Sequence, residues 1–336
     1  MAIPEDIGSY LDSVYKGHSI NDSSELHALA TTLQKCLSKL GGEGSYNPSE
    51  LKLELDCTRA SSHALMSSSP SNGVTIRQIY TDSCLIQCLL DLTSDDKKEE
   101  EMFWLDCIRL LDGAIIFSGA PERMDMVQGL IEHIQSTKLV PIPSSSHWSP
   151  RFSSARHDGP LPFCGGTIPK IEEPDMISFL TTWCKRPFVI GQGIAHWPAL
   201  SAHPWSSHQY LREVAGRGRV VPVEIGRDYR LDNWGQEMME WEEFLEKVET
   251  GVDPLVYLAQ HSLLSQFPKL REDICVPDLV YFSPTTEYGK YVPPANEDGV
   301  IINAWLGPKG TISPAHQVCA EIAFNLTAQT NLGPVL

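Results

Sequence analysis

The sequence of 336 residues lacks Cys-x-x-Cys pairs, long apolar runs and an excess of basic side chains. Its nine cysteines include no Cys-x-x-Cys pair, which argues against a zinc site and favours reduced, mostly buried thiols. No apolar run reaches the roughly 18 residues of a membrane span, and no secretory leader pattern opens the sequence. We therefore expect no membrane partner and a nuclear or cytoplasmic location.

Acidic residues outnumber basic ones by 43 to 26, which gives a formal net charge of −17 and a pI near 5.0. Nucleic-acid binding by phosphate neutralisation needs a clustered basic surface, so a direct nucleic-acid partner is not expected. A basic protein partner is compatible with this charge, as is plain solubility. The apolar content of 42% suits a globular core, and the length suits two domains.

Apolar residues in the first 137 positions recur at helical spacing. One stripe runs from Leu26 to Leu40 and is followed by Gly41, a residue type that often ends helices. Similar stripes occupy residues 76–92, 103–115 and 124–134. These patterns predict an all-α N-terminal domain over residues 1–137.

Proline and serine dominate residues 138–174, which predicts a linker. Beyond it, short strands are expected at 187–190, 220–225 and 300–306, and short helices at 207–215 and 241–248. The predicted fold class is therefore α+β, with a helical domain followed by a mixed domain over residues 175–336.

Five short motifs in the second half are specific when they are taken together in their order along the chain. They read RPFVI at 186–190, AHWPAL at 195–200, VPVEIG at 221–226, YLAQH at 257–261 and INAWLGP at 302–308. Together with the stretch from Thr311 to His316, they resemble the JmjC-domain family of Fe(II)- and 2-oxoglutarate-dependent oxygenases over about residues 175–317. The resemblance implies a cupin-type double-stranded β-helix, a jelly roll, of which this chain would hold an incomplete copy.

The resemblance also implies cofactor-binding residues. Chemistry in this family needs three ligands on one face of an iron ion, with positions left for 2-oxoglutarate and O₂. Carried over by position, His316 would be the first iron ligand. Tyr257 and Ser313 would bind the distal carboxylate of 2-oxoglutarate, and Trp305 would line that pocket.

Two further positions concern the substrate. By the same resemblance, Glu224 and Trp234 would hold the cationic side chain of a protein substrate, such as a histone or a ribosomal protein, through charge pairing and aromatic stacking. Each position also has a plain structural alternative. Glu224 could lie at a solvated strand edge, Trp234 could anchor a loop, and Tyr257 could be a core residue with a satisfied hydroxyl.

The iron-ligand motif that begins at His316 is not finished. Ligands at positions i and i+2 of a strand point to one face, but Val318 stands where a carboxylate is needed. No histidine follows His316, and Glu321 would project to the opposite strand face. No catalytic set is complete, so we expect an oxygenase by lineage that is inactive as this sequence stands.

Two explanations for the break stay open. Either the locus encodes a truncated protein, or the sequence reads through an intron, since Val318 and Cys319 can be encoded by GTATGT, a typical intron start. Intact upstream motifs favour the second explanation. A barrel without its later strands would also expose the edge of the strand at 300–306, which predicts low solubility for this half. The rival functional hypothesis is a non-catalytic interaction module built on the helical domain.

Overall fold

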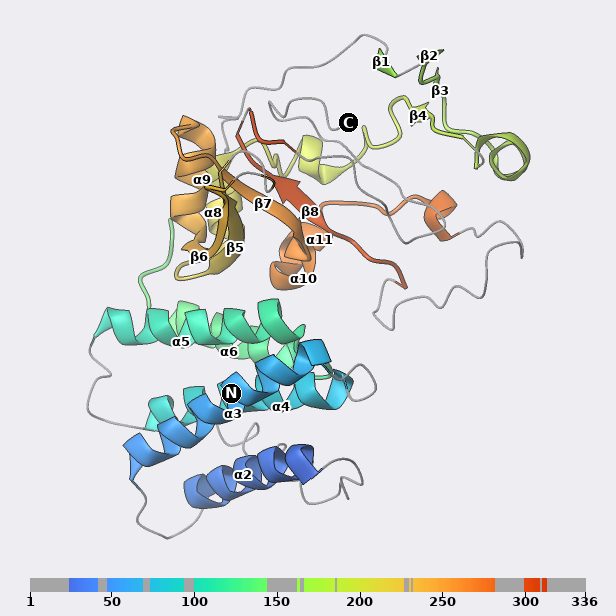
Figure 1. The fold of residues 1–336 in the computed structure, drawn as a ribbon. Coiled ribbons are helices and arrows are strands. Elements are labelled where there is room, and N and C mark those ends of the chain that lie inside the picture. The colour runs from blue at the N-terminus through green and yellow to red at the C-terminus, as the bar shows by residue number, and fades with distance from the viewer. Residues whose placement is uncertain are drawn as a thin grey trace. The chain divides into compact units, whose positions relative to one another are not determined.

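The computed structural model describes residues 24–41, 47–68, 73–93, 100–143, 162–163, 166–184, 186–226, 230, 232–281, 299–308 and 310–312. The fold is α+β, as predicted, with helices in the N-terminal part and an antiparallel sheet in the C-terminal part (Figure 1). The chain divides into two compact units. The helical unit extends to Ile142 and also takes in Gly216–Val221, whereas the sheet unit comprises Pro143–Ala215 and the chain from Pro222 onward.

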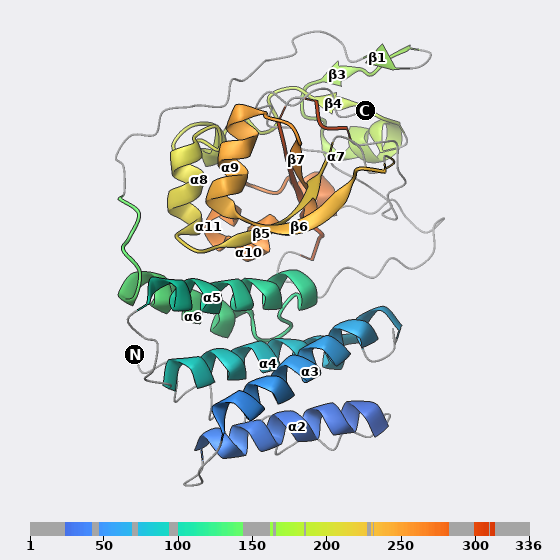
Figure 2. The same ribbon diagram turned by 60° about the vertical axis from the view of Figure 1, so that its left-hand side comes forward.

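The helical unit is built from amphipathic helices stacked in layers. In both ribbon views α2 is followed by the pair α3 and α4, and then by α5 and α6 (Figures 1 and 2). The elements are α2 (Ser24–Gly41), α3 (Pro48–Ser68), α4 (Gly73–Thr93), α5 (Glu101–Gly113), the π-helix η2 (Ala114–Ser118) and α6 (Met124–Thr137). Leucine and isoleucine side chains from every layer form one buried cluster. The predicted stripes therefore face the core of this unit.

Cysteines behave as the spacing predicts, because every cysteine in the described ranges is a free thiol. Cys36, Cys84, Cys88 and Cys107 are buried within the helical unit. Cys84 and Cys88, one helical turn apart, have no exposed surface and act as small core residues.

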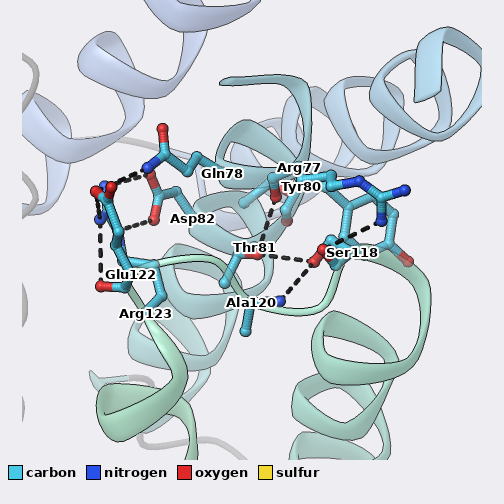
Figure 3. A network of polar contacts seen from close by, with 10 residues as sticks. Arg77, Gln78, Tyr80, Thr81, Asp82, Ser118, Ala120, Glu122 and Arg123 are labelled. Atoms are coloured by element: carbon cyan, nitrogen blue, oxygen red, sulfur yellow. Dashed lines mark hydrogen bonds and ion pairs between the residues drawn. The ribbon is translucent and has the colours of Figure 1, made fainter. Parts of the chain in front are cut away.

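A buried polar network ties α4 to the turn between η2 and α6 (Figure 3). The Arg123 guanidinium donates to the Asp82 carboxylate through Nε at 2.9 Å, and both side chains are buried. The Thr81 and Ser118 hydroxyls lie 2.8 Å apart, and Arg77 donates to the Ser118 carbonyl at 3.3 Å. One polar face of α4 thus fixes the path of the chain into α6.

The sheet unit begins with short elements. They are β1 (Pro162–Phe163), β2 (Gly166–Thr167), β3 (Lys170–Ile171), α7 (Met176–Ser178), the π-helix η3 (Phe179–Trp183), β4 (Val189–Ile190) and the 3-10 helix η4 (Pro198–Leu200). Three of these strands, each two residues long, lie inside the segment 138–174, whose assignment as a linker stays a prediction. One of them, β3, pairs in parallel with β4. Val189 N–H donates to the Pro169 carbonyl at 2.9 Å, a bond that proline can still accept.

Longer elements complete the sheet unit. They are α8 (His208–Ala215), β5 (Val220–Ile225), β6 (Gly235–Glu240), α9 (Trp241–Thr250), β7 (Val256–His261), α10 (Leu263–Gln266), α11 (Pro268–Arg271), the 3-10 helix η5 (Asp278–Tyr281) and β8 (Ala304–Leu306). The sheet has the order β6-β5-β7-β8, and β7 runs antiparallel to both β5 and β8. The predicted strands at 187–190 and 300–306 are shorter than expected, whereas 220–225 is found in full as β5.

Aromatic residues form the centre of the sheet unit. Trp241 stacks on Phe244 at 5.6 Å between ring centroids and meets Phe267 edge-on at 5.1 Å. The Trp241 indole also donates to the Leu211 carbonyl at 3.0 Å, which joins α9 to α8 (Figure 2). None of the helices in the described ranges combines the length and apolarity needed to cross a bilayer.

Candidate functional site

Three predicted site residues project from one face of the sheet. Glu224 on β5 stands directly across from Tyr257 on β7, and directly opposed residues in paired strands share a face. Leu258 stands across from Leu306, so the preceding residue on β8, Trp305, lies on the Tyr257 face. The strands β5, β7 and β8 are neighbours in the sheet (Figure 1). Their pairing thus places a carboxylate and two aromatic residues on the same face.

A fourth predicted residue, Trp234, joins this group through a hydrogen bond. Its indole nitrogen donates to the Glu224 carboxylate at 3.2 Å, and both side chains are half-buried. Gly226, at the end of β5, has a φ of +109°, which suits glycine, and its Cα faces the backbone of Trp234. A Cβ at Gly226 would lie 3.6 Å from the Trp234 Cα. The hydrogen bond therefore places the ring edge against the carboxylate.

Tyr257 is buried against a glycine of the INAWLGP motif. A Cβ built on Gly307 would lie 2.7 Å from Cδ2 of Tyr257, closer than real contacts allow, and 3.1 Å from Cγ2 of Thr311, which is a tight contact. Only a residue without a side chain fits beneath this ring. Trp305, two positions earlier, keeps 38% of its surface exposed. The tyrosine is thus held rigidly, and the tryptophan faces the surface.

Two residues predicted for the iron and 2-oxoglutarate sites, Ser313 and His316, lie outside the described residues, so their roles stay predictions. Within the described ranges, no group of three or more His, Cys, Asp or Glu side chains is placed to hold a metal ion. His261, at the end of β7, is instead buried and lies 2.7 Å from the Gln266 side-chain oxygen. An imidazole followed two positions later by Val318 does not fit an Fe(II) centre, since valine offers no lone pair.

A buried aspartate organises the loop after the AHWPAL motif. Asp273 accepts hydrogen bonds from Trp205 Nε1 at 2.9 Å and from the Tyr210 hydroxyl at 2.5 Å, and lies 2.6 Å from Nδ1 of His203. Its backbone carbonyl accepts from Ala199 N–H at 3.1 Å. Burial, the hydrogen bond to Asp273 and its charge raise the pKa of Tyr210, so this hydroxyl stays a donor at neutral pH. Sequence reasoning missed this cluster, because no local spacing links partners so far apart.

Comparisons with known proteins agree with the motifs. Residues 182–329 match the Cupin-like domain family. The chain is 32% identical, over 72% of its length, to lysine-specific demethylase 8 of Danio rerio, and 31% identical, over 71%, to Jumonji C domain-containing protein 5 of Drosophila melanogaster. Lysine-specific demethylase 8 of Xenopus tropicalis is 40% identical over 45% of this chain and 31% of that protein.

The matched parts cover 58% of the zebrafish protein and 56% of the fly protein, so the chain spans less than two thirds of these relatives. The matches to the zebrafish and fly proteins cover more of this chain than the cupin-like domain does, and the range of that domain, 182–329, includes the five motifs. Residues 182–329 thus carry a cupin-like domain of the JmjC type.

Proposed function

We propose that this chain derives from a JmjC-type protein oxygenase that uses Fe(II), 2-oxoglutarate and O₂ to hydroxylate or demethylate a basic side chain on a protein. The names of the zebrafish and frog relatives, lysine-specific demethylase 8, support a substrate with a lysine side chain. A histone or a ribosomal protein has the required basic character. A nuclear or cytoplasmic location belongs to the same proposal.

The observation that carries the proposal is the shared sheet face of Glu224, Tyr257 and Trp305, with Trp234 hydrogen-bonded to the carboxylate. A half-buried carboxylate attracts a cation more strongly than an exposed one, because the surroundings screen it less. Aromatic rings beside it add cation–π attraction. This arrangement can therefore bind a lysine or arginine side chain without any metal ion.

We further propose that this chain, with the sequence given, does not activate oxygen. Three ligands on one face of the iron are required, and the sequence offers His316 with Val318 in place of its carboxylate neighbour. The chain would then keep the basic-side-chain site while lacking the catalytic centre.

Succinate release tests this proposal. Full-length protein, Fe(II), 2-oxoglutarate and a lysine- and arginine-containing peptide are incubated, with a His316→Ala variant as the control. We expect no succinate above the control, while calorimetry still detects peptide binding. Turnover above the control would refute inactivity, and absence of any peptide binding would refute the retained site.

A separate experiment tests why the iron-ligand motif stops after Gln317. Sequencing the transcript distinguishes read-through from truncation. An mRNA that is contiguous across the codons of Gln317 and Val318 contradicts the intron explanation, which we favour because the upstream motifs are intact.

A non-catalytic interaction module is the second candidate. The helical unit has a core of its own and leaves Leu53, Val74 and Met102 more than half exposed. Leu53→Asp and Met102→Asp variants separate the two candidates. Loss of basic-protein binding in these variants, with binding unchanged in Glu224→Gln, would favour the helical module.

A further inference from the structure

The segment Gly216–Val221 belongs to the helical unit although it follows α8 in the chain. Its residues form hydrogen bonds with side chains of α5 and α6. These helices precede the segment by more than seventy residues in the sequence. The sequence-based domain border gave no hint of this grouping. We therefore asked what the segment and its partners do.

A buried ion pair holds the segment. Nε and Nη2 of Arg219 donate to Oδ1 of Asp112 at 2.9 and 2.7 Å, and Nε also lies 3.0 Å from Oδ2. Oδ2 in turn accepts from the Val220 backbone N–H at 2.9 Å. Both side chains are almost fully buried. Arg217 forms a second, more exposed ion pair with Glu101, the first residue of α5.

The fit is selective for glycine as well as for arginine. Gly216 and Gly218 have φ values of +73° and +79°, which glycine adopts without strain. A Cβ on Gly216 would lie 2.6 Å from the Gln135 side-chain amide, which donates to the Arg217 carbonyl at 2.8 Å. A Cβ on Gly218 would lie 2.7 Å from Cδ2 of Leu105. Each residue of the Gly-Arg-Gly-Arg sequence therefore has a specific neighbour on α5 or α6.

Val220, whose N–H is bound by Asp112, is also the first residue of β5, the strand that carries Glu224. A slip of one residue in a strand turns every side chain to the opposite face. A main-chain bond at the start of β5 therefore resists the slip that would turn Glu224 away from Tyr257.

We infer that the helical half of this protein is an anchor for β5, in which Asp112 is a positioning residue that grips Arg219 and the Val220 N–H. The role of Glu224 in binding a basic side chain rests on the proposed function, but the anchoring does not. The anchor gives the helical half a task inside the chain that is independent of any external partner.

Hydrogen exchange followed by mass spectrometry on the full-length protein tests the anchor. In Asp112→Ala, amides of residues 219–225 should exchange at least about tenfold faster, the effect of losing roughly 1.4 kcal/mol of local protection. Peptides from α2 and α9 should keep their protection. The matched control is Asp106→Ala, which removes an exposed carboxylate from the same helix and should leave β5 unchanged.

A second, milder variant keeps the test decisive if Asp112→Ala unfolds the whole protein. Arg219→Lys keeps the charge but loses the paired N–H donors, so it should raise exchange in 219–225 by a smaller factor while the helices stay protected. Unchanged β5 exchange in Arg219→Lys, or faster exchange confined to α5 and α6 in Asp112→Ala, would overturn the anchor. Neither result depends on peptide binding, so failure of the anchor and failure of the proposed function stay distinguishable.

Discussion

Trp234 donates an indole hydrogen bond to Glu224, which lies ten residues earlier on β5. The bond engages one oxygen of the Glu224 carboxylate, and under the proposed function the other oxygen would meet a cation. It also orients the indole ring beside the position that such a cation would occupy. β5 lies between β6 and β7, so Glu224 is not on an edge strand. A loop anchor would make the same hydrogen bond, and the binding role of both residues stays a prediction.

Glu224→Gln should weaken binding of a lysine- and arginine-containing peptide about tenfold, because it removes the charge and keeps the shape and the acceptor for Trp234. Calorimetry on the full-length protein measures this change. Glu237→Gln, an identical change on the exposed edge strand β6, is the control and should alter affinity little. Equal losses in both variants would mean that only overall charge matters.

Gly307→Ala should lower the free energy of unfolding by about 1–3 kcal/mol, since the new methyl group collides with the Tyr257 ring and Thr311. Urea unfolding followed by tryptophan fluorescence gives the value. Gly235→Ala is the control, because a Cβ there meets no described atom within 4 Å. A Gly307→Ala protein as stable as the control would contradict the tight packing of Tyr257.

Arg123→Met should destabilise the helical unit by about 3–5 kcal/mol, because it leaves the buried Asp82 carboxylate without its cation. Replacing both partners, as in Asp82→Leu with Arg123→Met, should recover most of the loss. Helical circular dichroism in urea follows both changes. The exposed pair Arg109 and Asp106 serves for comparison, and its removal should cost at most about 1 kcal/mol.

Alkaline pH should destabilise the helical unit through its buried thiols. Burial raises the pKa of Cys84 to about 12, and burial together with the charge and hydrogen bond of Glu54 raises that of Cys36 to about 12. The unfolded chain loses these protons near pH 9 while the folded chain keeps them. The free energy of unfolding therefore falls as pH rises from about 9 toward 12.

Urea unfolding at about pH 8 and about pH 10.5 measures this fall. Cys84→Ala should make the fall smaller, whereas Cys57→Ala, at an exposed position, should leave it unchanged. An identical pH dependence in all three proteins would show that other groups control alkaline stability.

Most helices could be predicted because their apolar stripes are strong, but α3 was not identified as a separate helix. Its buried positions are Leu51, Leu55, Thr58 and Ser62, so half of the stripe is polar. The two hydroxyls are satisfied inside the helix, since Thr58 donates to the Glu54 carbonyl and Ser62 to the Thr58 carbonyl. A hydrophobicity pattern cannot register hydroxyls that are buried in this way.

The sheet shows the same limit. β6 was not predicted, because only Met239 of its six residues is buried and the strand has no apolar alternation. The pairing of Glu224 with Trp234 was expected only as two separate roles. Neither the ion pair of Arg219 with Asp112 nor the Asp273 cluster has any local pattern, since their partners are brought together by the tertiary fold alone.

The place of Gly216–Val221 in the helical unit has a consequence for synthesis on the ribosome. A nascent chain that has emerged only through α6 already holds the Asp112 carboxylate but not the guanidinium that neutralises it. Domains usually fold as they emerge, N-terminal part first. Here one buried ion pair of the helical unit forms only after residues beyond α8 have been translated, so this unit cannot complete its contacts before part of the second half has been made.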